Sequence, residues 1–218
     1  MLETVDQLTQ LTALRALNIS ETNVTDISPL AALPDLELLN IDILDLEDIS
    51  VLAKLKKLEV LILGGIEKVN YEPLSTLINL RELDLSSTDF NNTSLLKPLT
   101  KLELLALEST PIRDIEFISG LPNLKGLDIA NLKVHSFEPI FANPKFEILN
   151  LYNTGLSDLK PLAKLKNLRL LRVGRCDISN EDIAFLQQAN PNLTITNDDS
   201  NTILQSLPFN RLETKFSF

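Results

Sequence analysis

The sequence predicts an α/β solenoid, in which short repeated units stack side by side and share one parallel sheet. Three observations predict this fold: apolar residues recur every 22 positions, two of them in each repeat are two positions apart, and a polar residue typical of helix starts follows them. Aromatic residues make up only 5% of the chain and Trp is absent, whereas leucine recurs every few residues. This composition is typical of a core built from one repeated aliphatic side chain.

We number the positions of each repeat from an anchor residue, which is apolar in seven of the eight repeats. Further apolar residues follow at offsets of three, six and eight, as Leu36, Leu39 and Ile41 follow Leu33. The anchors, at position 1 of their repeats, are Leu11, Leu33, Leu55, Leu77, Leu99, Leu121, Asn143 and Leu165.

The apolar residues at positions 7 and 9 of a repeat predict a short strand. Because they are two positions apart, both lie on one face of that strand, and positions 6, 8 and 10 lie on the other. A single repeat cannot bury its apolar face, but stacked repeats bury it continuously, at about 1.5–3 kcal/mol for each covered leucine. We therefore expect Leu39, Leu83 and Leu127 to face the core.

Each repeat returns through a segment that begins with a residue typical of a helix N-cap. Such side chains accept a hydrogen bond from a backbone N–H that would otherwise have no partner. The residues at position 16 are Asp26, Asp48, Asn70, Asn92, Asp114, Ser136, Asp158 and Asn180. Proline follows at position 19 in four repeats, as Pro29, Pro73, Pro139 and Pro161. Because proline is tolerated in the first turn of a helix, we expect short helical or 3₁₀ turns.

Three segments, VTDISPLAAL (24–33), IRDIEFISGL (112–121) and LSDLKPLAKL (156–165), resemble the 22-residue class of leucine-rich repeat. That class occurs in bacterial internalins and in a regulatory subunit of protein phosphatase 1, and the resemblance extends from residue 11 to about residue 178. It implies a right-handed curved solenoid with about eight to nine parallel strands on the concave face, where ligands usually bind, and short turns on the convex side. The signal peptide, helical cap and Ig-like domain of internalins are not visible here.

The sequence divides into three parts. Residues 1–10 keep only the second half of a repeat and predict a thin N-terminal cap. Residues 11–196 are the repeats, and the last one is extended by a helix around Ile183, Phe185, Leu186 and Ala189 and by a ninth strand. Residues 197–218 leave the pattern, and three alternatives stay open for them: a cap on the last strand, a tail that binds a partner, or an unstructured end.

The net charge of −10 is concentrated in the first half of the chain. Residues 1–109 hold 18 acidic and 8 basic residues, whereas residues 110–218 hold 12 of each. Because position along a solenoid follows the sequence, we expect an acidic N-terminal half and a basic region near Lys160–Arg175. An acidic chain without interleaved basic and aromatic residues disfavours nucleic acid as a partner.

The residues of the sequence do not form a catalytic or metal-binding pattern. A nucleophile needs a base within hydrogen-bond reach, but His135 and Cys176 are nearly two repeats apart. We therefore expect no enzymatic activity, no metal site and no cofactor. The single cysteine fits a reducing compartment, and neither a signal peptide nor a membrane span is visible. The expected location is cytoplasmic, with secretion as the alternative if a signal sequence precedes this chain.

The candidate binding site is the concave face. Leu38, Val60, Ile62 and Leu104 are expected to form an exposed apolar stripe beside acidic residues, and such a stripe marks an interaction site unless drift among the repeats produced it. Tyr152 is the one aromatic residue in these rows and a candidate anchor. The candidate partner-binding residues are Leu38, Asn40, Asp42, Val60, Ile62, Glu82, Asp84, Glu108, Asp128, Asn150, Tyr152 and Arg172.

Three functions are compatible with these features. The first is a monomeric scaffold or regulator that binds a protein partner on its concave face without catalysing a reaction. The second is a fragment of a secreted or surface bacterial adhesin or effector. The third is an acidic inhibitor or immunity-type protein that neutralises a basic partner by charge complementarity.

Overall fold

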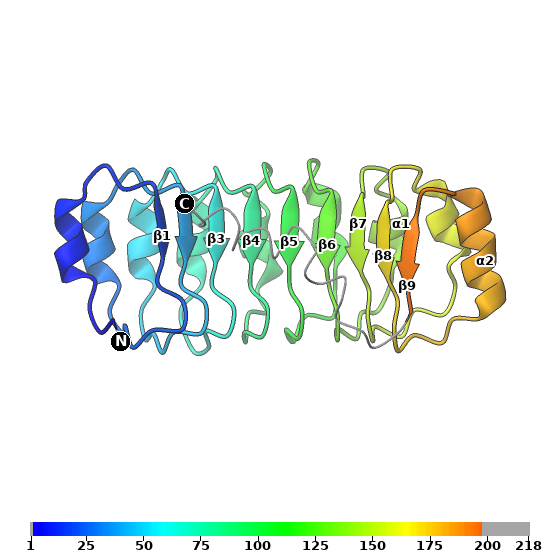
Figure 1. The fold of residues 1–218 in the computed structure, drawn as a ribbon, viewed down its shortest axis with the longest axis horizontal. Helices are drawn as coiled ribbons and strands as arrows, with labels where there is room; N and C mark the ends of the chain where they lie inside the picture. The colour runs from blue at the N-terminus through cyan, green and yellow to red at the C-terminus, as the bar shows by residue number, and fades with distance from the viewer. Residues whose placement is uncertain (1, 198–218) are drawn as a thin grey trace.

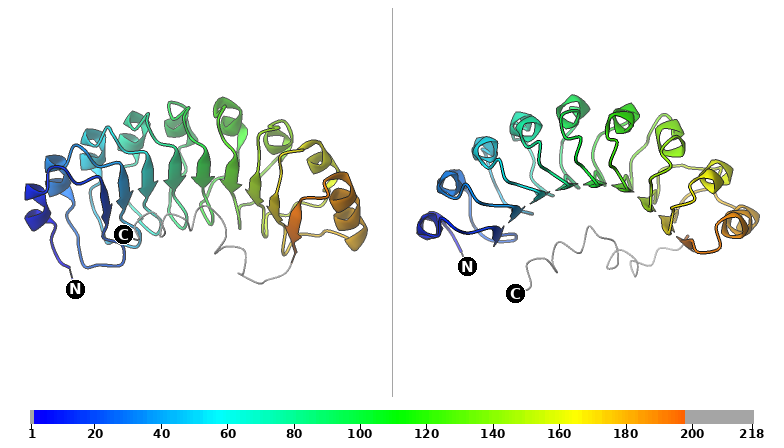
Figure 2. Two further views of the ribbon diagram at one scale, coloured as in Figure 1. Left: turned by 45° about the horizontal axis from the view of Figure 1, so that its top comes forward. Right: turned by 90° about the horizontal axis from the view of Figure 1, so that it is seen from above.

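Residues 2–197, the part of the chain that the computed structural model describes, form a curved solenoid (Figure 1). Nine parallel strands make one sheet, in which each strand pairs with the next along the chain. Seen from above, the strands line the inner side of an arc and the helical turns lie on its outer side (Figure 2). The predicted α/β solenoid with eight to nine concave strands is therefore confirmed.

Every strand has three residues and occupies positions 6 to 8 of its repeat. Neighbouring strands pair with an offset of 22 residues, as in the pairs Leu17–Leu39 and Leu83–Leu105. The last pair, Leu171 with Ile195, has an offset of 24 because the eighth repeat is longer. The strands are β1 (Ala16–Asn18), β2 (Leu38–Asn40), β3 (Val60–Ile62), β4 (Glu82–Asp84), β5 (Leu104–Ala106), β6 (Gly126–Asp128), β7 (Ile148–Asn150), β8 (Leu170–Arg172) and β9 (Thr194–Thr196).

The return segments form short turns, most of them 3₁₀ helices. Proline occupies the first turn in four of them, as predicted. The turns are η1 (Asp6–Gln10), η2 (Ser28–Ala32), η3 (Ser50–Lys54), η4 (Glu72–Thr76), η5 (Thr93–Leu96), η6 (Glu116–Gly120), α1 (Glu138–Phe141), η7 (Lys160–Lys164) and α2 (Asn180–Ala189). None of the helices within residues 2–197 has the length and apolarity that crossing a bilayer requires.

Most of the polar residues at position 16 lie one residue before the N-cap, whereas Asn92 is itself the N-cap of η5, as predicted. Asp26 Oδ1 accepts a hydrogen bond of 2.7 Å from the backbone N–H of Ser28, but Ile27, between them, is the N-cap. The side chain thus closes an Asx turn that leads into the helix. Asp48, Asn70, Asp114, Ser136 and Asp158 make the same contact. In the eighth repeat the N-cap is Ser179, whose hydroxyl accepts from Asp182 N–H, and not Asn180.

The leucine rows form one continuous core. Leu39, Leu83 and Leu127 are buried, which confirms the predicted direction of position 7. Leu11 is exposed although it occupies the anchor position, because only the short turn η1 stacks on that side of the first repeat. Phe185 is also exposed, and α2 packs on the core through the buried Leu186 and the partly buried Ile183.

Threonine hydroxyl groups at position 12 support the bend after four of the strands, β1, β4, β5 and β7. The Thr88 hydroxyl donates to the carbonyl of Leu85 at 2.6 Å, and Thr110 and Thr154 make the equivalent bonds at 2.8 and 2.7 Å. These threonines are buried, so the bonds satisfy carbonyl groups that the turning chain removes from water.

The residue at position 11 adopts a left-handed backbone conformation in all eight repeats. The sequence does not predict this conformation. Gly65 is the one glycine among these residues, with a φ of 68°. Ile43 has a φ of 55°, which is strained for a β-branched side chain. The other residues with this conformation at position 11 are Glu21, Ser87, Ser109, Asn131, Asn153 and Arg175.

The predicted cap or tail falls almost wholly on residues 198–218, which lie outside the described residues. At the other end, Val5 is buried against the core and η1 stacks on η2. The ninth strand, β9, closes the described part of the sheet.

Candidate functional site

The concave face consists of the side chains at positions 6, 8 and 10, which lie on the side of the sheet opposite the leucine core. Strand pairing aligns each position into a row, so that Glu82 neighbours Leu104 and Asp84 neighbours Ala106. Adjacent members of a row belong to strands ~4.8 Å apart. All the candidate partner-binding residues lie in these three rows.

The expected exposed apolar stripe is only partly present. Val60 and Ile62 are 3% and 8% exposed, and with Leu38 they form a small cluster separate from the main core. Leu38 and Leu104 are half-buried. Val60 and Ile62 are therefore corrected from exposed to buried residues, because close spacing along and between the rows lets side chains on the inner side of an arc cover one another.

The polar residues at position 8 have a structural role that the sequence analysis missed. Asn40, Asp84 and Asp128 each accept, through Oδ1, a hydrogen bond of 2.8–3.0 Å from the backbone N–H two residues later. Asn150 does the same with Tyr152 N–H at 3.2 Å. In these repeats the side chain satisfies a backbone N–H of the bend that follows the strand. The recurrence of Asn or Asp at position 8 is the signal that could have shown it.

Asn150, one of the candidate contact residues, is fully buried. Its Nδ2 donates to Asp128 Oδ2 at 2.8 Å, so its two polar groups are used within the fold. Asn40 and Asp128 are also buried. The candidate residues that offer the largest accessible surface are Leu38, Asp42, Glu82, Asp84, Glu108 and Tyr152, which are half-buried.

Four carboxylates on this face, Asp42, Asp84, Glu108 and Asp128, form what we call the acidic cluster. Burial raises the pKa of Asp42 to about 6, and the neighbouring charge of Asp84 adds to the shift. Burial also raises the pKa of Asp128 to about 7, with a further contribution from the charge of Glu108. The pKa values of Asp84 and Glu108 are raised for the same main reason. The cluster therefore combines desolvation with mutual repulsion, and both would be relieved by a cation.

A glycine beside Asp42 makes room for its carboxylate. A Cβ at Gly64 would lie 2.5 Å from Asp42 Oδ1 and 3.1 Å from the carbonyl oxygen of Ser86. Gly64 thus permits the close approach of neighbouring repeats at position 10 on the concave face.

The C-terminal end of the concave face holds a basic and aromatic group. The Arg172 guanidinium carbon lies 4.1 Å from the centroid of the Tyr152 ring, and that of Arg175 lies 5.7 Å from it. Arg172 is only 6% exposed. Arg169, in contrast, lies at position 5 and pairs with Glu147 at 3.6 Å. The basic region expected near Lys160–Arg175 is therefore divided between two surfaces.

A row of acidic and basic residues at position 5 was missed in the sequence, although its 22-residue spacing was visible there. Glu103 contacts Arg81 and lies 2.9 Å from Lys125 Nζ, and these contacts lower the pKa of its carboxyl group. Arg15 pairs with Glu37 in the same way. The basic side chains of these pairs are exposed and the glutamates are partly exposed, so each pair contributes about 0–1 kcal/mol.

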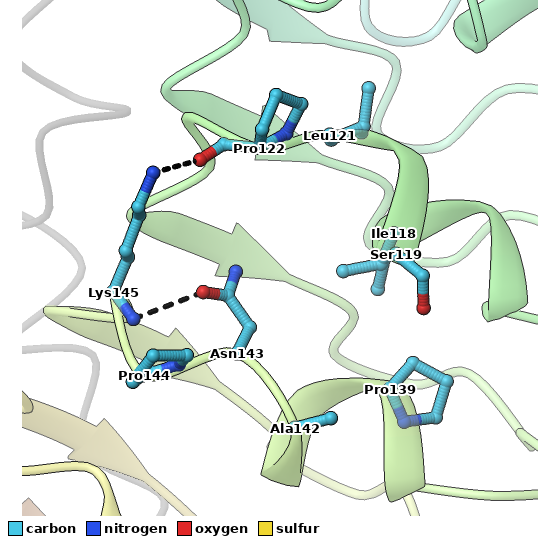
Figure 3. Close-up of a pocket in the computed structure, with 9 residues that line it drawn as sticks. All are labelled: Ile118, Ser119, Leu121, Pro122, Pro139, Ala142, Asn143, Pro144 and Lys145. Atoms are coloured by element: carbon cyan, nitrogen blue, oxygen red, sulfur yellow. Dashed lines mark hydrogen bonds between the residues drawn. The ribbon is translucent and has the colours of Figure 1, made fainter.

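A pocket of about 230 Å³ lies between η6 and α1, where Asn143 replaces the anchor leucine (Figure 3). Its lining is mainly apolar side chains with prolines, and Lys145 reaches across to the carbonyl of Pro122 (Figure 3). The Asn143 side-chain amide donates a hydrogen bond of 3.2 Å from Nδ2 to the carbonyl oxygen of Leu124. Its Oδ1 accepts one of 3.0 Å from the backbone N–H of Lys145. The pocket is smaller than ordinary small-molecule sites, which are about 300–1,000 Å³, and convergent polar groups are not part of its lining.

Cys176 is the cysteine considered for catalysis, and its thiol contacts residues of the preceding repeat. Cys176 is half-buried, and its Sγ lies 3.2 Å from the carbonyl oxygen of Leu151 and 3.8 Å from Thr154 Oγ1. Across residues 2–197, His, Cys, Asp and Glu side chains do not form a group of three or more that could hold a metal ion.

Comparison with known proteins gives a structural match. No protein-family model and no curated protein matches the sequence. The chain is 30% identical to an internalin C2 from Listeria monocytogenes, with a TM-score of 0.74 over 85% of this chain and 82% of that one. An internalin (inlF) from the same species is 22% identical, with a TM-score of 0.56 over 95% and 82% of the two chains. The plant peptide hormone receptor RGFR1, solved in complex with RGF2, is 16% identical with a TM-score of 0.61 over 90% and 41%.

Proposed function

We propose that this chain, which belongs to the internalin-type leucine-rich-repeat family, is a non-catalytic module that binds a protein partner on its concave face. Leucine-rich-repeat structures serve as protein-interaction modules in general, and the similar proteins include internalins and peptide receptors. The complex of RGFR1 with RGF2 is an example in which a solenoid of this kind holds a peptide hormone.

The acidic cluster is the observation that carries the proposal. Asp42, Asp84 and Glu108 are half-buried and lie within one surface, where burial and mutual repulsion raise their pKa values. The charged form of such carboxylates is stabilised when a cationic group approaches, because attraction to the cation offsets both the desolvation and the mutual repulsion. The half-buried side chains of Leu38 and Leu104 lie in the neighbouring row and add apolar surface. A protein segment that carries basic and apolar side chains fits this surface.

A regulator or scaffold is the form of the proposal that we favour, and it does not require catalysis. The carboxylates of Asp84 and Asp128 in the acidic cluster accept backbone hydrogen bonds that hold the strand ends. We further propose that the chain acts as a monomer and that its partner is a protein rather than a nucleic acid, because the exposed charge of the N-terminal half is acidic.

The similarity to internalins favours a second candidate function, in which this chain is part of a secreted or surface bacterial adhesin or effector. The two candidates differ in location: the first places the protein in the cytoplasm and the second outside the cell. Fractionation of the source organism, with an antibody against this chain, distinguishes them. Detection in the cytoplasmic fraction supports the first, and detection in the medium or at the surface supports the second.

The proposed binding face is tested with amide variants that keep the shape and the hydrogen bonds of the acids. The partner is first recovered by affinity capture from the source organism, and its affinity is then measured for the wild type and for Asp84→Asn combined with Glu108→Gln. We expect the double variant to weaken binding about tenfold or more, as for loss of charge-assisted contacts. The matched control is Asp45→Asn with Glu67→Gln, two exposed acids outside the concave rows.

The control variant changes net charge by the same amount, so it separates a local contact from long-range attraction. Binding that weakens equally in the control and the concave variant, or in neither, would contradict the concave site. A strong decrease of affinity with added salt, together with the loss in the concave variant, would identify the partner surface as basic and favour the inhibitor-type alternative.

A further inference from the structure

Two buried polar atoms at the C-terminal end of the concave face have no hydrogen-bond partner among residues 2–197. They are Arg172 Nε, in β8, and Thr196 Oγ1, in β9. Arg172 and Thr196 are aligned in the strand pairing, so their side chains lie side by side on the same face of the sheet. Tyr152, in the preceding repeat, covers one face of the guanidinium group.

The charge of Arg172 is also uncompensated by any ion pair within the described range. Arg169 has Glu147 as its partner, whereas the Arg172 guanidinium carbon lies 4.1 Å from the centroid of the Tyr152 ring and has no ion pair among residues 2–197. The charge of Arg172 lowers the pKa of Glu108, against the larger effect of burial. A guanidinium that is 6% exposed loses most of its hydration, and buried charges in proteins are nearly always paired with an opposite charge.

We propose that Arg172 and Thr196 bind a carboxylate group of the protein partner. This inference rests on the proposed function, because it names the chemistry of one contact on the same concave face. The planar guanidinium presents its Nε edge to a carboxylate in a geometry that permits two parallel hydrogen bonds. The Thr196 hydroxyl donates a further bond, and the Tyr152 ring blocks one face of Arg172 so that the ligand approaches at the edge.

The carboxylate site at Arg172 and Thr196, together with the acidic cluster, determines the orientation of the bound partner. The acidic residues Asp84 and Glu108 belong to the fourth and fifth repeats, whereas Arg172 belongs to the eighth. A bound segment therefore places its acidic group toward β8 and β9 and its basic groups toward β4 and β5. The reverse orientation would bring like charges together at both ends, which is unfavourable.

A carboxylate on a partner has two sources, the side chain of Asp or Glu and the free C-terminus, and small probes separate them. The ¹⁵N-labelled full chain is titrated with N-acetylglycine, which mimics a C-terminus, and with the α-amide of N-acetylaspartate, which mimics an acidic side chain. N-acetylglycinamide is the neutral control. The readout is the Nε–H resonance of Arg172, assigned by its loss in Arg172→Gln.

We expect at least one carboxylate probe to shift the Arg172 Nε–H resonance in a saturable way, and the neutral probe to leave it unchanged. The probe that shifts it identifies the source. Thr196→Val should weaken the effective probe about threefold or more, and Arg169→Gln should change its affinity less than about twofold, because Arg169 is exposed and already paired. Failure of both carboxylates to move the resonance would overturn the inference, as would a response to inorganic phosphate alone.

One further variant tests whether the chain supplies the carboxylate itself. Asp198 and Asp199 follow β9 in the sequence. If probes shift the Arg172 resonance only after Asp198→Asn with Asp199→Asn, the natural ligand of Arg172 is intramolecular and the inference is overturned.

The carboxylate titration also separates this inference from the proposed function. Loss of partner binding in the Asp84→Asn and Glu108→Gln variant without any probe response at Arg172 would reject the carboxylate site alone. A probe response at Arg172, with partner binding insensitive to every concave variant, would reject the proposed function alone.

Discussion

The side-chain amide of Asn150 donates a hydrogen bond of 2.8 Å to the carboxyl group of Asp128 across the neighbouring strands β7 and β6. The same two side chains each accept a hydrogen bond from the backbone N–H two residues later. They therefore link adjacent repeats and also stabilise the bend that follows their own strands. Asp128 belongs to the acidic cluster as well. The concave face therefore uses one set of residues both to hold the repeats in register and to create its charge.

Asp128 should make the stability of the protein depend on pH. Its pKa is raised to about 7 in the folded state by burial and by Glu108 and Asp84, whereas an unfolded Asp titrates near 3.9. The folded state thus binds the proton more tightly, and the stabilisation is present below the unfolded pKa and is lost as pH rises through the folded one. Asp128→Asn removes this pH-dependent loss, although it also replaces the oxygen that accepts from Asn150 Nδ2 by an NH2 group. The unfolding free energy of the variant relative to the wild type should therefore be lower at pH 5 than at pH 8.

Denaturant unfolding of both proteins across this range measures the difference. Asn150 and Ala130 N–H both face the carboxyl group, and an amide keeps the oxygen that accepts from Ala130. Parallel pH profiles for the wild type and the variant would show that Asp128 does not titrate as described.

Ile43 should be a position where a substitution stabilises the protein. Its φ of 55° is strained for a β-branched residue, and its side chain is 60% exposed, so little packing is lost when it is replaced. Ile43→Asn should raise the unfolding free energy by about 1 kcal/mol, because asparagine tolerates the left-handed region. Thermal and denaturant unfolding measure the change. The control is Ile78→Asn, where the isoleucine is 56% exposed but the backbone φ is not positive; an equal gain at both sites would refute strain as the cause.

Leu105 should be essential to the stacking of the repeats. It is buried in the core at position 7, between Leu83 and Leu127 in the strand pairing. Leu105→Ala should cost about 2–5 kcal/mol in unfolding free energy, because it leaves a cavity that neighbouring repeats fill only in part. Leu11→Ala, at an exposed anchor, should cost about 0.5 kcal/mol or less. Comparable losses for the two variants in chemical denaturation would contradict the assigned burial.

The inward direction of Leu39, Leu83 and Leu127 was predictable because it depends only on the two-residue period of a strand. The accessibility of Val60 and Ile62 was not, because it depends on how closely neighbouring rows approach on a curved sheet. The left-handed backbone at position 11 has no constant residue type, so Ile43 gave no signal in the sequence.

The contact between Tyr152 and Arg172 also lay beyond the sequence pattern. These residues occupy positions 10 and 8 of successive repeats, and only their side-chain conformations bring the ring and the guanidinium together. The Asp and Asn residues at position 8 did recur visibly, but their role as acceptors for the N–H two residues later required the geometry of the bend. The rows of the repeat thus predicted where the candidate surface lies. Side-chain packing determines which residues of that surface are accessible.

Site-specific photo-crosslinking tests the central claim most directly. A photo-reactive residue is introduced at Leu104, half-buried on the concave face in β5, or at the exposed Ile78, which lies outside the concave rows. If the concave face binds the partner, the adduct forms from position 104 and not from position 78. Adducts from position 78, with none from position 104, would place the partner on another surface and contradict the proposed function.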